Sequence, residues 1–199
     1  MNREPKQTIL YGGAFNPPTK AHAAIVKGLA ELARERDADL WLMPSGERHD
    51  KSIMADLAIR TAYVHALLAS GETHGVDTHI ENYELMKAET TETFTTNRYL
   101  EERYPDRHFT WVFGSDSVNT MRRWRRGAWL LDHIDMIVIE RPGFELIETP
   151  KRHRILKLGE MAMSSSDVRR RISEGDEIES LVPAPVIGVL RQTGILAAS

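Results

Sequence analysis

Short apolar runs alternate along this chain with longer segments of helical periodicity, and this order restricts the fold more than any other feature. The apolar runs predict strands at 9–11, 39–43, 76–80, 109–113 and 136–139. The segments between them predict helices near 20–36, 53–70, 93–104 and 117–131. Parallel strands need a crossover connection, and a helix supplies one. The sequence therefore predicts an α/β protein with a doubly wound parallel sheet.

The last part of the chain departs from this alternation. Arginine, proline and glycine at 141–143 end the fifth predicted strand. Side chains at 164–167 then offer N-cap oxygens to a helix that Gly175 closes, and a last helix is expected between 183 and 194. No repeat or linker interrupts the sequence. We therefore expect one domain over 1–199, with a small helical C-terminal part.

Charge and composition exclude several classes of partner. The 26 basic and 29 acidic residues leave a net charge of −3, so no overall field attracts nucleic acid or an anionic membrane. Cysteine is absent, which excludes disulfides, thiolate catalysis and cysteine-ligated metals. No apolar stretch is long enough to span a bilayer, and the polar start at 1–7 lacks a signal-peptide core. We expect a cytoplasmic protein that binds neither nucleic acid nor membrane.

The junction after the first predicted strand has the composition of a phosphate-binding loop. It reads YGGAFNPPTKAH at 11–22, and Gly12 and Gly13 let the backbone approach a ligand without a Cβ in the way. The following helix points free N–H groups and the positive end of its dipole into this loop, which favours a phosphate. His22 on the first turn can donate to that phosphate, and Thr19 adds a hydroxyl donor. A lone histidine at a helix start is also an ordinary exposed residue.

A second anion-binding pattern occurs near the other end of the chain. It reads SSSDVR at 164–169, where serine hydroxyls and free N–H groups at a helix start can hold an anion. Arg169 adds a planar, permanently charged fork. Alone, this pattern also describes a capped helix with a solvated arginine face at 169–171. Together, the two patterns predict a triphosphate held from two sides.

In spacing and order, the two patterns resemble the nucleotidyltransferase superfamily that has a GxFxPxHxGH loop, or its TxGH variant, and a later ISSTxxR motif. Within it, the chain most resembles the bacterial nicotinate-nucleotide adenylyltransferase family, over nearly its whole length. The connecting segments are similar as well: TFTTN at 93–97 to SYTxD, FGSD at 113–116 to IGAD, RW at 123–124 to KW, ERPG at 140–143 to xRPG, and LVP at 181–183 to the start of the last helix. The resemblance implies a Rossmann-like fold.

The chain departs from this family's pattern at the nucleotide loop and after the second predicted strand. Thr19 stands where the family usually has histidine, although the phosphopantetheine branch has threonine there. Ala21 replaces a glycine and adds a methyl group where the backbone passes the nucleotide. The segment 44–51 lies where the family has a PPHK-like loop, but the proline pair is absent. His49 and Lys51 are therefore expected only as contacts of the substrate phosphate.

The resemblance implies that AMP passes from ATP to nicotinate mononucleotide, giving deamido-NAD and pyrophosphate in NAD biosynthesis. The catalytic positions that it implies are His22, Arg169 and Thr19. The implied ATP-binding positions are Gly12, Gly13, Ala14, Phe15, Gly114, Asp116, Ser164, Ser165 and Ser166. The implied substrate-binding positions are Lys51, His49, Thr95 and Trp124. Mg²⁺ is expected to bind mainly through the ATP phosphates, with no metal site in the protein.

Trp124 is the candidate for stacking on the pyridine ring, because a pyridinium ring stacks well on an indole face. Arginines flank it at 122, 123, 125 and 126. A ring at the edge of a pocket is therefore favoured over burial in the core. The same arginines also suit a solvated face or a contact in a homo-oligomer.

Three alternatives stay open at this point. Nicotinamide mononucleotide can be the acceptor, because the sequence does not choose between the acid and the amide. Phosphopantetheine is suggested by Thr19, although the chain length and the Arg123-Trp124 pair favour a pyridine nucleotide. A catalytically weak nucleotide-binding relative is suggested by Thr19 and Ala21 together.

Overall fold

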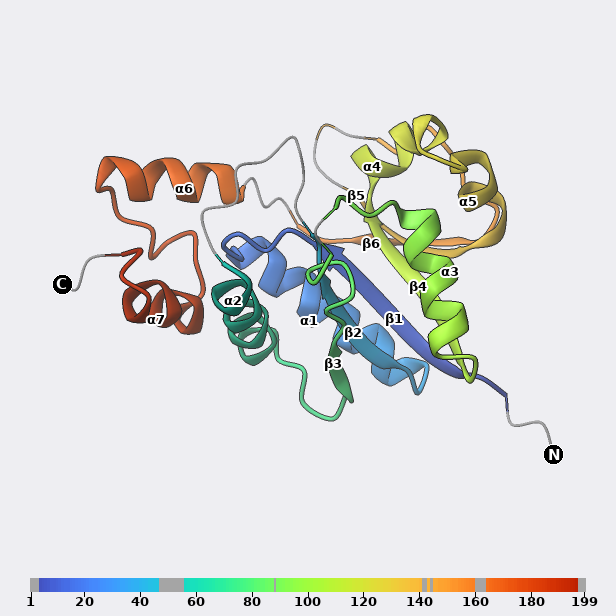
Figure 1. The fold of residues 1–199 in the computed structure, drawn as a ribbon, viewed down its shortest axis with the longest axis horizontal. Helices are drawn as coiled ribbons and strands as arrows, with labels where there is room; N and C mark the ends of the chain where they lie inside the picture. Colours follow the sequence, from blue (N-terminus) through green and yellow to red (C-terminus); the bar gives the residue numbers. More distant parts are fainter. Residues whose placement is uncertain are drawn as a thin grey trace.

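A computed structural model describes residues 4–46, 56–87, 89–140, 143, 145–159 and 164–196. Within these residues, six parallel strands form one sheet in the order β3-β2-β1-β4-β5-β6 (Figure 1). The strands are β1 (Lys6–Gly13), β2 (Asp39–Pro44), β3 (Thr78–Ile80), β4 (Arg107–Gly114), β5 (Asp135–Glu140) and β6 (His153–Lys157). This is the doubly wound, Rossmann-like arrangement that the sequence predicted.

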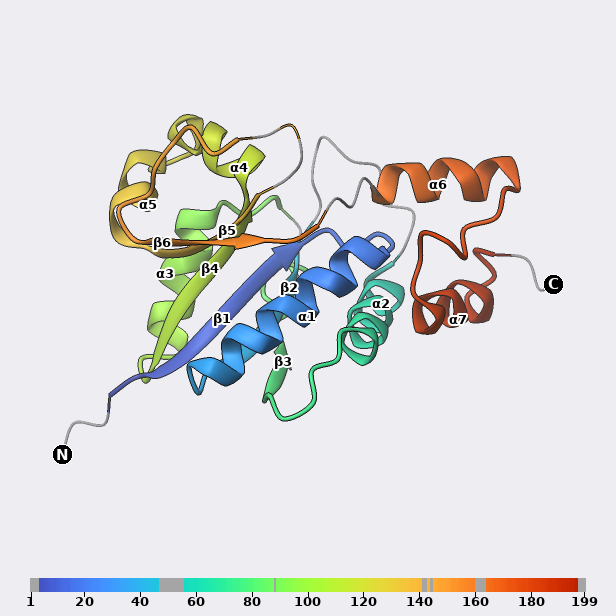
Figure 2. The same cartoon turned by 180° about the vertical axis from the view of Figure 1, so that it is seen from behind.

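Helices cover both faces of the sheet. They are α1 (Lys20–Glu35), α2 (Leu57–Ser70), α3 (Thr93–Arg103), α4 (Ser115–Thr120), α5 (Gly127–His133), α6 (Ser165–Glu174) and α7 (Ala184–Gln192), with a 3₁₀ turn, η1 (Met121–Arg123), after α4. The first two helices pack on one face, and α3, α4 and α5 pack on the other (Figures 1 and 2). Among the described residues, no helix has the length and apolarity needed to cross a membrane.

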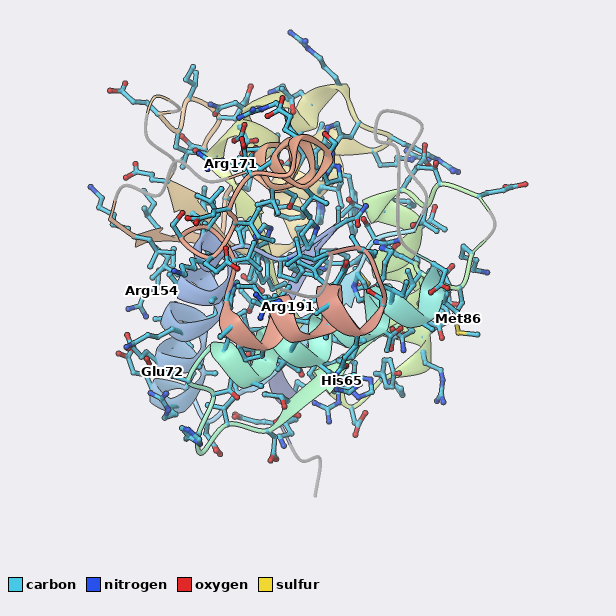
Figure 3. The ribbon with its side chains drawn as sticks, turned by 90° about the vertical axis from the view of Figure 1, so that its left-hand side faces the viewer. His65, Glu72, Met86, Arg154, Arg171 and Arg191 are labelled. Carbon is cyan, nitrogen blue, oxygen red and sulfur yellow. The ribbon has the colours of Figure 1, made fainter. Side chains whose placement is uncertain are left out.

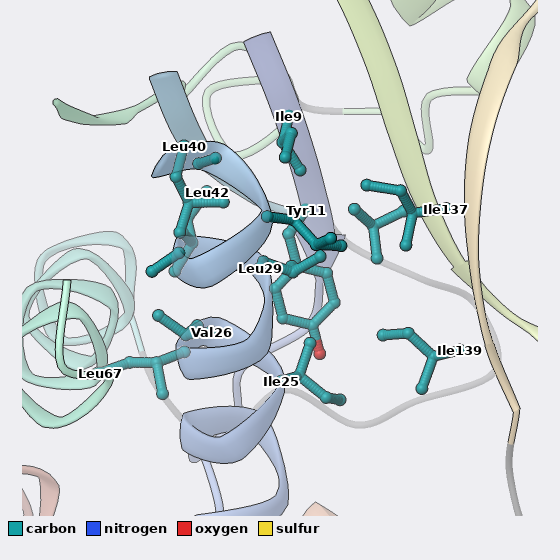
Figure 4. Packing of buried hydrophobic residues seen from close by; sticks show 14 of the residues in the cluster. Ile9, Tyr11, Ile25, Val26, Leu29, Leu40, Leu42, Leu67, Ile137 and Ile139 are labelled. Atoms are coloured by element: carbon teal, nitrogen blue, oxygen red, sulfur yellow. The ribbon is translucent and has the colours of Figure 1, made fainter. Parts of the chain in front are cut away.

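Successive side chains of each strand point to opposite faces, so each strand contributes to two cores. On the α1 side, Ile9, Leu40 and Ile137 pack with Leu29 of the helix (Figure 4). On the other side, Leu10 belongs to a cluster built with α3, α4 and α5. Burial on both faces explains why the central strands are continuous apolar runs.

A third apolar cluster joins the C-terminal helices to α2. Tyr63 of α2 packs with Val168 of α6 and with Leu190 of α7. Figure 3 looks onto this end of the molecule, where Arg171 lies on α6 and Arg191 on α7. Burial raises the pKa of Tyr63 to about 12, so its hydroxyl stays neutral in this cluster. The cluster ties α6 to the body of the protein.

One strand was not predicted. β6 pairs with β5 at the edge of the sheet, and its sequence, HRILK, is mostly charged and exposed. An edge strand pairs along one side only, and here it covers little apolar surface. Its periodicity is therefore too weak to identify it from the sequence.

The helix expected near 117–131 is broken. Trp124 is extended, with φ −77° and ψ 160°, and Arg126 is left-handed, with φ 55°. The N–H of Gly127 donates to the carbonyl oxygen of Trp124 at 2.9 Å and closes this turn. A Cβ at position 127 would lie 1.8 Å from the carbonyl oxygen of Met121. Glycine therefore permits the turn that brings Trp124 against Phe113, with their ring centroids 6.0 Å apart.

Gly127→Ala is expected to lower the free energy of unfolding by roughly 2–3 kcal/mol, because the new methyl group displaces backbone rather than a side chain. Thermal unfolding measures this effect. Gly188→Ala is the matched control, since no atom lies within 4 Å of the added Cβ. Alanine within α7 should raise stability by up to about 1 kcal/mol. Equal melting temperatures for the two variants would contradict this account of the turn.

A charged cluster lies at the amino ends of the central strands β1, β2 and β4. Asp39 is 5% exposed and accepts from Arg107 at 2.5 Å, while Lys6 lies 2.7 Å from its other oxygen. Burial raises the pKa of Asp39, but the hydrogen bonds and charges of Lys6 and Arg107 outweigh it, so the net pKa is lowered. The folded state therefore favours the ionised carboxylate.

Asp39→Asn should lower the free energy of unfolding at pH 7 by roughly 2–3 kcal/mol, because the cations lose a buried partner. Since folding depresses this pKa, the contribution is fully present above about pH 4 and is lost as the pH falls further. Urea unfolding at pH 7 and pH 3 should therefore show the two proteins converging in acid. Asp77→Asn is the control, because Asp77 contacts Lys6 at 3.5 Å but is exposed. A pH-independent difference would contradict the prediction.

Candidate functional site

The loops after β1 and β4 meet at the carboxyl edge of the sheet, where the chain changes from one face to the other. β1 ends at Gly12 and Gly13, and β4 ends at Gly114. Asp116 lies in the first turn of α4, directly after that strand. In open α/β sheets, ligands bind in the crevice at such a switch point. The structure thus brings these sequence-predicted residues to one edge.

Phe15 anchors the loop between β1 and α1. It is 1% exposed, and its ring packs edge-on against Tyr11 and His22, with centroids 5.4 and 5.5 Å away. A Cβ at Gly13 would lie 2.9 Å from this ring. The absence of a Cβ at Gly13 therefore leaves room for the Phe15 ring inside the protein. It also leaves room for a ligand to approach the backbone. The neighbouring Ala14 is partly exposed.

Thr19 and His22 form a capping arrangement at the start of α1. The backbone N–H of Thr19 donates to Nδ1 of His22 at 3.1 Å, and the Thr19 hydroxyl lies 2.8 Å from the same nitrogen. Because a backbone N–H can only donate, Nδ1 acts as the acceptor, and the neutral ring carries its proton on Nε2. Thr19 is fully buried, and its hydroxyl faces the histidine. The threonine thus orients the ring.

The amino end of α6 docks on the same loop, although the two segments are far apart in the sequence. Arg169 donates from Nη1 to the carbonyl oxygen of Asn16 at 2.8 Å and from Nη2 to Ser166 at 3.2 Å. Ser165 donates to the carbonyl oxygen of Pro17 at 2.9 Å. Ser164 caps the helix by accepting from a backbone N–H at 3.1 Å. The structure therefore brings together the two segments that the sequence predicts to bind an anion.

The predicted acceptor side is less completely described. Thr95 is exposed near the start of α3, and Trp124 is half-buried against Phe113. His49 and Lys51 lie outside the described residues. Within the described part of the chain, no group of three or more His, Asp or Glu side chains is placed to hold a metal ion.

Arg60 was missed by the sequence analysis. It lies on α2, is 3% exposed, and donates from Nη2 to the carbonyl oxygen of Ala14 at 3.0 Å and to that of Ser45. The sequence does carry a signal for it. Arg60 falls at helical spacing from Tyr63 and Val64, which are buried. A charged residue on an apolar helix face is a candidate for a special role.

The chain has clear similarity to known proteins. It matches the model of the cytidylyltransferase-like family over residues 10–171. The probable nicotinate-nucleotide adenylyltransferase of Exiguobacterium sibiricum is 31% identical over 193 residues, which cover 94% of this chain and 97% of that protein. The protein of the same name in Bacillus licheniformis is 30% identical, over 89% of this chain and 91% of its own length.

A solved structure supports the fold. The nicotinic acid mononucleotide adenylyltransferase of Plasmodium falciparum, complexed with NaAD, aligns with a TM-score of 0.81. The alignment covers 95% of this chain and 96% of that one, at 20% sequence identity. At this identity, the likeness concerns the fold.

Proposed function

This chain belongs to the nicotinate-nucleotide adenylyltransferase family, within the cytidylyltransferase-like group, and on that premise we propose that it transfers AMP from ATP to nicotinate mononucleotide. The products are deamido-NAD and pyrophosphate. One observation carries the proposal at the level of the site: Arg169 of α6 donates to the loop that leads from β1 to His22. A polyphosphate at this edge meets an imidazole from one side and a guanidinium from the other.

The reaction needs positioning and charge neutralisation more than a nucleophilic side chain. The phosphate of the mononucleotide attacks the α-phosphorus of ATP in line, a new P–O bond forms, and the bond to pyrophosphate breaks. No general base is required, because a phosphate monoester is already largely ionised near neutral pH. Mg²⁺ enters as part of the substrate MgATP and reduces the charge repulsion between the reacting phosphates.

His22 has the role of a hydrogen-bond donor in this proposal. Nδ1 accepts from the backbone of Thr19, so Nε2 presents the proton of the neutral ring. Donation from Nε2 to ATP phosphate oxygens strengthens as charge accumulates on the leaving group. Arg169 stabilises the same charge from α6, with the hydroxyls of Ser164–Ser166 around the helix start.

The acceptor is proposed to bind beside Trp124, with its pyridine ring on the indole face and Thr95 at the edge of the pocket. Phe113 packs edge-on with the indole ring, with 6.0 Å between the ring centroids. His49 and Lys51 are proposed to contact the acceptor phosphate. The whole chain, 1–199, is proposed to act as one nucleotidyltransferase domain, because α6 contributes to a site that begins at β1. We propose a cytoplasmic location, where ATP is available.

Pyrophosphate release with MgATP and each candidate acceptor tests the proposal. Nicotinate mononucleotide should support turnover with a kcat in the ordinary enzyme range, about 1–10³ s⁻¹. Nicotinamide mononucleotide and phosphopantetheine are run in parallel. If kcat/KM is higher for either of these than for nicotinate mononucleotide, the proposed acceptor is wrong. Absence of turnover with all three, in a protein that still binds ATP, would leave only a nucleotide-binding role.

A further inference from the structure

Arg60 is a buried cation for which the described residues provide no carboxylate partner. It is 3% exposed, and no acidic side chain among the described residues forms an ion pair with it. Its Nε has no hydrogen-bond acceptor within the same residues. Burial lowers its pKa, but an arginine guanidinium remains protonated at neutral pH. His65 on the same helix is exposed, as Figure 3 shows, so burial is particular to the Arg60 face.

A buried charge in this position costs free energy. Burying a cation without an ionised partner removes its hydration. Two backbone carbonyls, those of Ala14 and Ser45, compensate part of that loss by accepting from Nη2. A buried charge is screened less than an exposed one, so the positive potential of Arg60 extends to the groups around it. It acts at the edge of the sheet where the proposed phosphates bind.

The two carbonyls belong to two different loops, one proposed to bind ATP and the other proposed to contact the acceptor. Ala14 begins the loop between β1 and α1, which leads to His22. Ser45 follows β2 directly, and its N–H donates to the carbonyl oxygen of Gly13 at 2.9 Å. The ladder between β1 and β2 therefore extends by one further bond, and Arg60 joins the loops beyond it. Movement of either loop would break a charge-assisted hydrogen bond.

We propose that Arg60 is a positioning residue that holds the loop after β1 (the nucleotide loop) and the loop after β2 (the acceptor loop) at a fixed separation and supplies a buried positive charge to the polyphosphate. This inference rests on the proposed function for its kinetic consequences. The part of the proposal that concerns the Arg60 charge predicts anion affinity, which can be measured whether or not the protein has turnover. Arg60 acts through its hydrogen bonds to the loop backbone and through its electrostatic field, without touching the reacting atoms.

Two substitutions separate charge from geometry. Arg60→Met removes the charge at similar length, whereas Arg60→Lys keeps the charge but replaces the planar fork with a single ammonium. The matched control is Arg107→Met, because Arg107 is a partly buried arginine that pairs with Asp39 where the strands begin, at the end of the sheet opposite to the proposed site. Both methionine variants should lose thermal stability. Only the variant at position 60 should lose anion affinity.

The measurements are the melting temperature, the Kd of tripolyphosphate by calorimetry at 50 and 200 mM salt, and the kcat and KM for both substrates. Arg60→Met should raise the Kd by about tenfold or more at low salt, and this difference should shrink at high salt. Arg60→Lys should recover most of the affinity for tripolyphosphate, but its kcat should stay about tenfold below wild type because the loops are no longer held.

Wild-type Kd and kcat in folded Arg60→Met protein would overturn the proposal. So would equal changes in the Arg60→Met and Arg107→Met variants, because they would reduce the role of Arg60 to stability. If the methionine variant does not fold, the lysine variant decides: wild-type kcat there contradicts the positioning role. Absence of turnover in the wild type would refute the proposed function, whereas the tripolyphosphate Kd would still judge the role of the Arg60 charge.

Discussion

His22→Gln is expected to lower kcat by about 10²- to 10³-fold, the usual effect of removing one donor to a charge that develops in the transition state. Glutamine is chosen because it can keep the cap: at the third position of a helix, its carbonyl oxygen can accept from the N-cap N–H. In this protein the N-cap is Thr19, whose N–H donates to His22. The variant should therefore lose the imidazole donor while α1 stays intact.

The measurement is kcat and KM for both substrates, together with thermal unfolding. The KM for nicotinate mononucleotide should change little, because the lost interaction acts on the leaving group. His65→Ala is the control, since His65 lies exposed on α2 (Figure 3). It should retain wild-type kinetics. His22→Ala should match the glutamine variant in kcat but lose a further ~1 kcal/mol of stability with the cap. A kcat near that of the wild type in both His22→Gln and His22→Ala would exclude histidine as the donor, because alanine has no side-chain donor.

Arg169→Lys is expected to reduce kcat/KM for ATP by roughly 10- to 100-fold, although the charge is conserved. The guanidinium reaches Asn16 with one nitrogen and Ser166 with the other, at 2.8 and 3.2 Å. An ammonium group cannot reproduce this fork, and a hydrogen bond from a charged donor contributes about 1.5–3 kcal/mol. The loss should appear for ATP and much less for the acceptor.

Arg170→Lys is the matched control on the same helix. Arg170 is exposed and pairs with Glu174 one turn later, away from the nucleotide loop. Its substitution should leave both KM values unchanged, because exposed ion pairs contribute little. An Arg169→Lys enzyme that differs from wild type only in melting temperature would restrict Arg169 to holding α6 in place.

The sequence predicted the central strands and the helices that join them because both faces of the sheet are buried. Ile9 and Leu10 point to opposite cores, and both are at most 2% exposed, so the run between polar flanks is continuous. The edge strand β6 escaped prediction for the reverse reason, since it is charged and exposed. The break at Gly127 also escaped, because it depends on contact with the backbone of Met121.

The candidate site was only partly accessible to sequence reasoning. The loop with His22 and the segment with Arg169 were identified by composition and spacing, and the family was confirmed by its relatives. Their contact, from Arg169 to the carbonyl oxygen of Asn16, requires the chain to return across the sheet. The roles of all the site residues, those at the phosphate-binding loop and α6 as well as Thr95, Trp124, His49 and Lys51, stay predictions.

By itself, the sequence determined the parallel sheet, the family and the residue types that can neutralise a polyphosphate, because periodicity and short motifs are local properties of the chain. Only the tertiary structure decided what Thr19 and Arg60 do. The backbone N–H of Thr19 donates to Nδ1 of His22, which places the proton of the neutral ring on Nε2, while Arg60 links two loops from inside the protein. The role of Arg60 arises from burial and from backbone groups brought together by folding, which no local pattern records. Thr19 contacts a residue only three positions along the chain, but the geometry of this cap is visible only in the structure.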